Sequence, residues 1–345
     1  MRRVGHLFDH VHDFETLRRA ARRARRGKRM RPDVLRFHLR EEDALHELGE
    51  SLRAGSWRPS GYSHFKVFEP KERWISAAPY ADRVVHHAIC AIIEPELERR
   101  MSGASYANRR GRGSHRAVLA AQAALGSCGY VLKLDVRQYF PSIDHALLQG
   151  QLARVFKERK LLQLLEYVVE SGARTRNDPP YLPEDDLFAP YDRPSGLPIG
   201  NLTSQLLGNY FLSAFDRWVA QELKPQRYIR FMDDLLVFDR EKRLLERAHA
   251  AIERELLVLR LRLHPKKTLL QPCREGVSFL GYVVEPARVR VRGVTLRRLR
   301  RRLRRARGAR ATNSGERPPG RASYAEHLAA WRGHTRWAGS WRQLP

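Results

Sequence analysis

The sequence predicts an α+β fold in which helices and antiparallel strands share one chain. Two helix-like segments, residues 39–55 and 82–101, flank residues 65–78, where apolar and basic residues roughly alternate. Residues 129–136 and 228–238 are strand-like apolar runs that carry acidic side chains. Helical periodicity beside period-two alternation indicates mixed structure. No segment repeats at a fixed period.

The N-terminal segment, residues 1–31, is predicted to form a basic amphipathic helix. It contains eleven Lys and Arg against three acids. Its apolar residues recur every three or four positions, which predicts one face that docks on the protein and an arginine face left for phosphate. A solvated charged face is the alternative. The apolar positions are Leu7, Val11, Phe14, Leu17 and Ala21.

The composition points to a polyanionic partner. The 345 residues suffice for two or three subdomains, and 65 Lys and Arg against 38 Asp and Glu give a formal net charge of +27. Nucleic acid is the commonest such polyanion, with a basic ribosomal or membrane-surface protein as the alternative. No apolar run approaches the roughly 20 residues of a membrane span, and the N-terminus lacks a signal-peptide core. We therefore expect no membrane partner and a cytoplasmic location.

The cysteines do not form a structural pattern. Cys90, Cys128 and Cys273 are too scattered for a disulfide framework or a zinc knuckle, which favours a reducing compartment. His86, His87 and Cys90 lie at helical spacing inside an apolar stretch. We predict helix packing there, with metal binding as the alternative.

Two segments differ in character from the rest. Residues 172–196 are rich in Pro, Asp and Tyr without periodicity and are predicted to form a surface loop. Residues 288–310 contain 12 Arg and no acid. Within them, Val and Arg alternate over 288–292 as in an exposed hairpin, and apolar residues at 296, 299, 303 and 306 predict a helix backed by arginine.

Adjacent acids interrupt the apolar run at Asp233 and Asp234. Two neighbouring carboxylates among apolar residues are unfavourable unless a cation or a tight turn compensates them. A hairpin with both at its tip would place them beside the end of the strand that carries Asp135. Three carboxylates there could hold two divalent ions about 4 Å apart, which suits in-line displacement at a phosphate. A simple Asp-Asp turn is the alternative.

The motifs around these carboxylates resemble those of reverse transcriptases. Phe231–Asp234 resembles the family's Tyr-x-Asp-Asp box, with Phe in place of Tyr, and residues 134–140 resemble its first aspartate motif. Seven motifs follow the family order between about Trp57 and Tyr282. The other five are the fingers, in two parts at 71–75 and 81–85, the motif at 105–109, the second palm motif at 196–205, the lysine motif at 264–268 and the primer grip at 279–282.

The resemblance implies a right-hand polymerase fold with fingers, a palm of antiparallel strands backed by helices, and a short helical thumb. It implies an RNA-directed DNA polymerase that uses two Mg²⁺ ions, dNTPs, a template RNA and the RNA/cDNA hybrid. The divisions expected are a basic N-terminal helix over 1–31, fingers with part of the palm over 32–125, the palm over 126–284, and an Arg-rich thumb with the C-terminal segment over 285–345.

The resemblance also implies roles for single residues. Asp135 and Asp233 would coordinate both Mg²⁺ ions, with the backbone carbonyl of Val136 assisting. Asp234 would matter for activity while coordinating less directly. Phe140 occupies the position of the steric gate that rejects the ribose 2′-hydroxyl, with an ordinary core Phe as the alternative.

Further residues are expected to contact the nucleotide or the duplex. Arg73 and Lys71 are the expected fingers contacts to the triphosphate, because guanidinium and ammonium groups match phosphate oxygens; Lys66 is a second choice. Lys267 would protonate the departing pyrophosphate as a general acid, and a solvated lysine is an equally good interpretation. The remaining expected contacts are Ile199 and Gln205 to the dNTP, and Gly281, Arg297, Arg298, Arg301 and Arg305 to nucleic acid.

Ile199 distinguishes this chain within the family. Most members carry Gln at this place of a Leu-Pro-Gln-Gly run, and Gln can hydrogen-bond around the nascent base pair, whereas Ile offers no polar atom. Residues 197–205 and 112–115 are similar to reverse transcriptases of diversity-generating retroelements, which make errors at template adenines and work with a small accessory variability protein. Group II intron, retron, CRISPR-linked and phage-defence enzymes are the alternatives, as is a catalytically idle, maturase-like RNA-binding protein.

Overall fold

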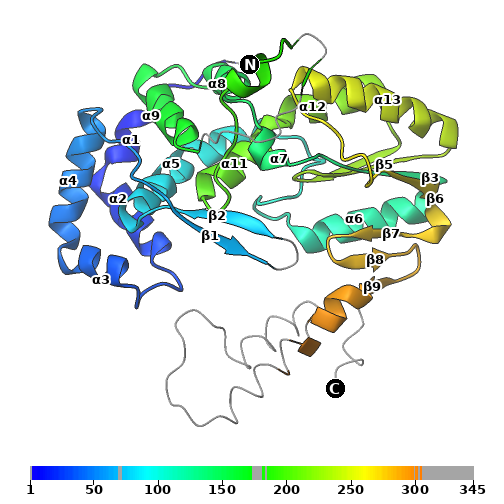
Figure 1. Cartoon of the computed structure of the whole chain (residues 1–345), viewed down its shortest axis with the longest axis horizontal. Coiled ribbons are helices and arrows are strands. Elements are labelled where there is room, and N and C mark those ends of the chain that lie inside the picture. Colours follow the sequence, from blue (N-terminus) through cyan, green and yellow to red (C-terminus); the bar gives the residue numbers. More distant parts are fainter. Residues whose placement is uncertain are drawn as a thin grey trace.

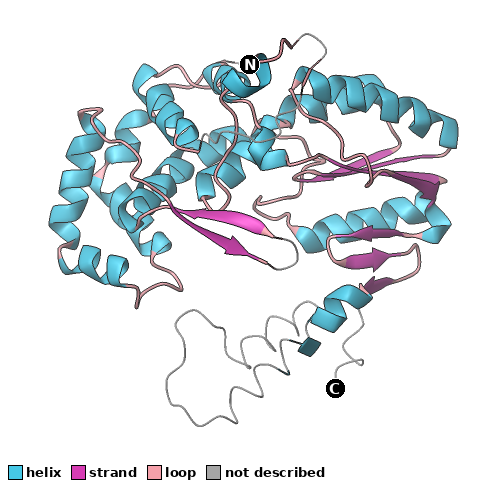
Figure 2. Cartoon of the chain, in the orientation of Figure 1, coloured by secondary structure: helices cyan, strands magenta, loops and turns pink. Residues whose placement is uncertain are grey.

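The computed structural model describes residues 2–68, 72–172, 181–182, 185–298, 300–301 and 304. Helices gather at one end of the molecule, and a four-stranded sheet with its covering helices forms the other (Figure 1). A three-stranded sheet lies beneath the larger one, and loops connect these layers (Figure 2). The predicted mixture of helices and antiparallel strands is confirmed.

The N-terminal basic segment folds into two helices rather than the one predicted. These are α1 (Phe8–His12) and α2 (Phe14–Ala24). Asp13 separates them because it has an extended backbone and its carboxylate accepts the Thr16 N–H (2.9 Å) as an N-cap. The predicted apolar face is confirmed, since Val11, Leu17 and Ala21 are fully buried. It packs largely on α5 (Tyr80–Glu98).

Two further helices and a two-stranded hairpin, whose first strand is exposed along its whole length, complete this part of the chain. The helices are α3 (Pro32–Leu39) and α4 (Glu41–Arg53). Strands β1 (Ser63–Val67) and β2 (Arg73–Ala77) pair antiparallel, as the alternating pattern predicts. On α5, His86 and Cys90 are buried, and burial lowers the pKa of His86 to about 4. The burial of both side chains on this helix agrees with the predicted helix packing.

The four-stranded sheet has the order β4-β5-β3-β6 and is antiparallel throughout. Side chains alternate between its faces: Leu132 and Leu134 enter one core, whereas Val131 enters the other. Helix α13 (Lys242–Val258) covers the first face and α6 (Ser114–Ser127) the second. The strands are β3 (Tyr130–Asp135), β4 (Arg227–Phe231), β5 (Asp234–Asp239) and β6 (Leu269–Pro272).

Shorter helices connect β3 to β4, and all of them except α10 contribute to the first core. They are α7 (Tyr139–Ser142), α8 (His145–Ala153), α9 (Arg159–Glu170), α10 (Ala189–Asp192), α11 (Leu202–Phe211) and α12 (Ser213–Trp218). The predicted surface loop over 172–196 is described only in part. Its described portion contains α10 and an ion pair between Arg193 and Asp185.

A small antiparallel sheet follows β6 and packs on α6. Its strands are β7 (Val277–Phe279), β8 (Tyr282–Val284) and β9 (Val289–Val291). The expected hairpin around 288–292 is therefore confirmed as β8–β9. Residues 293–298 are helical, and positions 299, 303 and 306 of the predicted apolar stripe lie outside the described residues. In the described part of the chain, no helix is long and apolar enough to cross a membrane.

Candidate active site

The three aspartates meet at one end of the four-stranded sheet. Strands β4 and β5 are joined by a tight turn through Met232 and Asp233, and Asp234 is the first residue of β5. Asp234 pairs directly with Asp135, the last residue of β3. The turn itself is Met232–Asp233 rather than Asp233–Asp234, and Met232 takes a left-handed φ of 54° that is unfavourable for a residue with a Cβ.

This arrangement concentrates negative charge. The pKa of Asp233 is raised to about 6, first by burial and then by the neighbouring Asp234, with Asp135 adding to the effect and Lys267 opposing it. Lys267 donates to Asp135 Oδ1. Lys133 Nζ lies 3.9 Å from Asp234 Oδ1 and donates to the Ser278 carbonyl (2.6 Å). Two lysines therefore partly balance the three carboxylates.

The donors at this edge fit a magnesium site in chemical type. They are carboxylate oxygens, which hard divalent cations prefer. The Val136 N–H donates to the Asp233 carbonyl (3.1 Å), so the backbone of Val136 lies against the turn. Within the described ranges, no three acidic, His or Cys side chains already converge to hold an ion, and Asp135 instead contacts Lys267.

Phe140 lies on α7, five residues after Asp135, and is half-buried. It packs on α11 where that helix has Gly208: a Cβ added to Gly208 would lie 3.0 Å from Phe140 Cε1. The Phe140 carbonyl accepts the Leu197 N–H (2.9 Å). Phe140, at the position expected for the steric gate, therefore packs against α11 and is hydrogen-bonded to the segment that precedes this helix.

Residues 196–200, which precede α11, contact both α7 and the β1–β2 hairpin. The carbonyl of Ile199 accepts the Ser76 N–H from β2 (2.9 Å). Gly200 has φ +128°, and a Cβ there would lie 2.9 Å from the Ser76 carbonyl, so this position requires glycine. Ile199 is half-buried and Gln205 is exposed on the first turn of α11.

The predicted phosphate contacts are only partly described. Lys71 lies outside the described residues, and Arg73 is exposed at the start of β2. Lys66, the second choice, forms an ion pair with Glu72 (2.6 Å) and lies 4.9 Å from the centre of the Trp74 ring. Arg73 is thus the better candidate of the two that are described.

The predicted nucleic-acid contacts lie within the small sheet and in the segment that follows it. Arg297 and Arg301 are exposed, whereas Arg298 is half-buried. Gly281 sits in the β7–β8 turn with φ +89°, and its carbonyl accepts the Arg292 N–H (3.0 Å). Arg305 lies outside the described residues.

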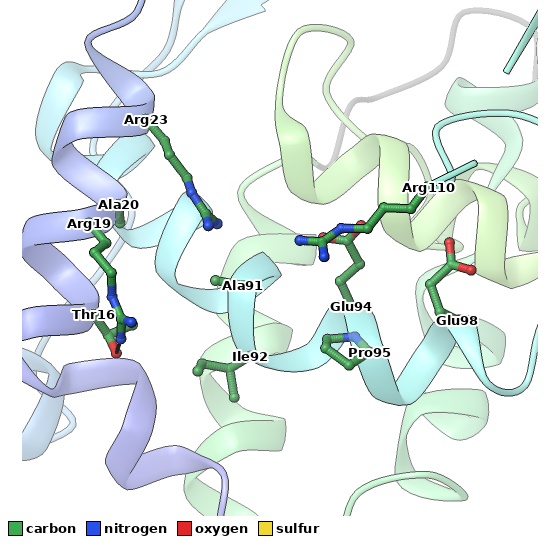
Figure 3. Close-up of a pocket in the computed structure, with 10 residues that line it drawn as sticks. All are labelled: Thr16, Arg19, Ala20, Arg23, Ala91, Ile92, Glu94, Pro95, Glu98 and Arg110. Carbon is green, nitrogen blue, oxygen red and sulfur yellow. Dashed lines mark hydrogen bonds between the residues drawn. The ribbon is translucent and has the colours of Figure 1, made fainter. Parts of the chain in front are cut away.

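A separate hollow of about 430 Å³ lies between α2 and α5 (Figure 3). Arg19 and Arg23 line it from α2, and Glu94 and Glu98 line it from α5. Arg110 completes its rim. Both signs of charge line the hollow, so the arginines of α2 face glutamates of α5 here rather than open solvent alone. None of the three aspartates contributes to its lining.

Sequence reasoning missed a buried charged cluster behind the turn. Arg230 of β4 is fully buried and forms a two-point ion pair with Asp216 of α12. The signal was an arginine inside an apolar strand-like run, between Ile229 and Phe231. Its partner lies fourteen residues away on a helix, which a local pattern does not reveal.

Comparison with known proteins places this geometry in a family. The family model described as "Reverse transcriptase (RNA-dependent DNA polymerase)" matches residues 66–284, more than half of the chain. The chain therefore belongs to the reverse transcriptase family. That range contains all three aspartates.

The similar proteins include intron-encoded ones. Group II intron-encoded protein LtrA of Lactococcus lactis subsp. cremoris is 25% identical over 183 residues, which are 52% of this chain and 29% of LtrA. Protein YkfC of Escherichia coli K12 is 23% identical over 283 residues, covering 69% of this chain and 70% of YkfC. The chain thus spans less than a third of LtrA.

A solved structure agrees at the level of fold. Telomerase from Candida albicans, in complex with a fragment of telomeric RNA, aligns over 73% of this chain and 49% of that chain. The TM-score is 0.50 and the identity 10%. The mixed fold with antiparallel sheets is thus consistent with the right-hand polymerase fold that the motifs imply.

Proposed function

We propose that this reverse transcriptase copies a template RNA into cDNA by nucleotidyl transfer at Asp135, Asp233 and Asp234. The observation that carries the proposal is the strand register. Asp234 stands directly opposite Asp135, and Asp233 lies in the adjoining turn. Family membership supports the same activity. A turn that needed only two polar residues would not require a third carboxylate on the neighbouring strand.

The residues at this edge would hold two Mg²⁺ ions. Asp135 and Asp233 supply the principal carboxylates, the Val136 carbonyl assists, and Asp234 supports the site. Bound Mg²⁺ supplies activation of the primer 3′-hydroxyl and charge stabilisation on the leaving pyrophosphate. The ammonium group of Lys267 donates a hydrogen bond to Asp135. It is therefore near enough to the site to donate a proton to the pyrophosphate.

The nucleotide pocket would lie between α7, α11 and the β1–β2 hairpin. Phe140 faces the sugar and rejects a 2′-hydroxyl, while Ile199 and Gln205 border the base pair. Arg73, together with Lys71, binds the triphosphate. The contact between Ile199 and Ser76 supports this grouping, because it holds the hairpin against the segment before α11.

The wider surfaces would hold the RNA/cDNA hybrid. Gly281 belongs to the primer grip, and Arg297, Arg298, Arg301 and Arg305 supply sequence-independent phosphate contacts, which weaken steeply with salt. The arrangement is a basic N-terminal segment at 1–31, fingers with part of the palm at 32–125, a palm at 126–284 and a thumb with the C-terminal segment at 285–345.

Primer extension tests the activity directly. Purified chain is given a primed RNA template, dNTPs and Mg²⁺, and Asp233→Ala is compared with Asp239→Ala. Asp239 lies at the opposite end of the same strand β5, so it controls for the loss of a carboxylate from that strand. Loss of extension in Asp233→Ala alone supports the proposal. Full activity of Asp233→Ala would refute the role assigned to Asp233, whereas an inactive wild type that still binds RNA would favour the idle RNA-binding alternative.

Within the family, we assign the chain to the error-prone enzymes of diversity-generating retroelements, with a small accessory variability protein as partner. The carrying residue is Ile199, where a Gln side chain would reach the nascent base pair. The intron-encoded relatives favour the alternative of a group II intron type enzyme. Sequencing of cDNA made with the accessory protein separates the two. Errors concentrated opposite template adenine, reduced by Ile199→Gln, support the first; uniform fidelity supports the second.

A further inference from the structure

Arg230 makes an unusual set of contacts for an arginine inside a sheet. The residue follows Ile229 on β4 and points to the opposite face from it, toward α11 and α12. Its side chain is fully buried. A guanidinium group has five N–H donors. The structure gives this one five acceptor contacts, so the buried cation is fully satisfied.

The acceptors come from three different elements. Asp216 of α12 accepts from Nε and from one terminal nitrogen, each at 2.7 Å. Asn209 of α11 accepts through its side-chain and backbone oxygens, each at 3.0 Å. The fifth contact goes to the carbonyl of Met232 (3.3 Å), the first residue of the turn that carries Asp233.

Further buried groups hold the acceptors in place. Ser105 Oγ donates to Asn209 Oδ1 (2.8 Å), and Asn209 Nδ2 donates to the Ala107 carbonyl (2.7 Å). The Tyr228 hydroxyl donates to Asp216 Oδ1 (2.9 Å). Arg230 therefore occupies the centre of a network that ties the turn to α11 and α12.

Stability alone is a weak explanation for this network. Apolar residues of similar volume often replace a buried ion pair at no cost, and a buried pair is retained in some proteins because it fixes one geometry. The backbone of Arg230 is anchored separately: its N–H donates to Ala104 (2.8 Å) and its carbonyl accepts from Tyr106 (2.9 Å). The backbone of β4 thus has hydrogen bonds on both of its edges, to β5 and to residues 104–106, apart from those of the Arg230 side chain.

We propose that Arg230 is a positioning residue that braces the carboxylate turn against α11. Through Met232 it fixes the peptide next to Asp233, in a turn whose left-handed φ at Met232 is otherwise unfavourable. Through Asn209 it also fixes α11. The residue before Asn209 in this helix is Gly208, which contacts Phe140. The side chain of Arg230 therefore holds the turn of Asp233 and the part of α11 that contacts Phe140 in a fixed relation. The catalytic consequence rests on the proposed polymerase function; the bracing itself does not.

The test replaces the pair without leaving an orphan charge. The double variant Arg230→Met/Asp216→Leu removes both charges at once, and Arg227→Met is the matched control, since Arg227 is exposed on the same strand. We expect the double variant to bind primed template as the wild type does. Its kcat should fall roughly ten- to hundredfold, because small displacements of catalytic groups have effects of that size. The Mg²⁺ concentration for half-maximal rate should rise, and Arg227→Met should change neither quantity.

A second readout does not depend on activity. Amide hydrogen exchange over residues 229–236 should be faster in the double variant than in the wild type, while exchange in α13 stays the same. A folded double variant with unchanged exchange, kcat and Mg²⁺ dependence would overturn the proposal. If the double variant does not fold, Arg230→Lys decides the matter, since lysine keeps the charge but has three donors: faster exchange in the turn supports bracing, and unchanged exchange refutes it. An inactive wild type would refute the proposed function but leave the exchange test valid.

Discussion

The ionised form of Asp233 should destabilise the metal-free protein at neutral and alkaline pH. Its pKa is about 6 in the folded chain, against an ordinary value of 3.8. The folded chain therefore holds this proton more tightly than the unfolded chain does. The contribution of the group to stability is fully present below about pH 3.8 and is lost as the pH rises through 6. Burial of the carboxylate is the main cause, and repulsion from Asp234 is the second.

The size of the effect follows from the two pKa values. Their separation corresponds to about 3 kcal/mol at pH values well above 6, because each tenfold change in proton affinity is about 1.4 kcal/mol. We take this as an upper bound, since Asp233 is half-buried and water screens part of the interaction. Asp233→Asn removes the ionisable group and should recover up to that amount.

Urea unfolding in EDTA, followed by tryptophan fluorescence, measures the gain. Asp233→Asn should be more stable than the wild type at about pH 8, and the difference should shrink toward zero near pH 4. Asp239→Asn, at the other end of β5, should show no such dependence. Equal stability of Asp233→Asn and wild type at both pH values, or a gain that does not change with pH, would refute the electrostatic reasoning.

Three further outcomes are expected at the same site. Phe140→Ala should raise kcat/KM for rNTPs relative to dNTPs by about tenfold or more, measured by single-nucleotide extension, because it removes the bulk that a 2′-hydroxyl would meet. Gly208→Ala should lower the free energy of unfolding by about 1–3 kcal/mol, since the added Cβ would lie 3.0 Å from Phe140 Cε1. In the double variant with Phe140→Ala this loss of stability should largely disappear. If the losses of the two single variants simply add, the contact is contradicted. Lys267→Met should lower kcat by about a hundredfold with unchanged template binding if Lys267 is the general acid; an unchanged kcat would leave it only a counter-charge to Asp135.

Local sequence determined much of this protein. Alternation of apolar and basic residues predicted the strands β1, β2 and β9, and spacing by three and four predicted the buried side of α1 and α2. The order of the motifs identified the family that the comparison confirmed. These features depend on residues close in sequence, because helix and strand periodicity and caps are set within a few positions. The break at Asp13 was readable in principle as an N-cap but was missed.

Tertiary structure decided which distant groups meet. That Asp234 stands opposite Asp135, that Lys66 is engaged by Glu72, and that Arg230 finds Asp216 follow from strand register and helix packing. A buried arginine is tolerated only where acceptors from several elements converge on it, because the cost of removing a charge from water must be offset by all of its contacts together. Such convergence belongs to the folded chain alone, so the aspartates could be named from sequence whereas the residue that positions them could not.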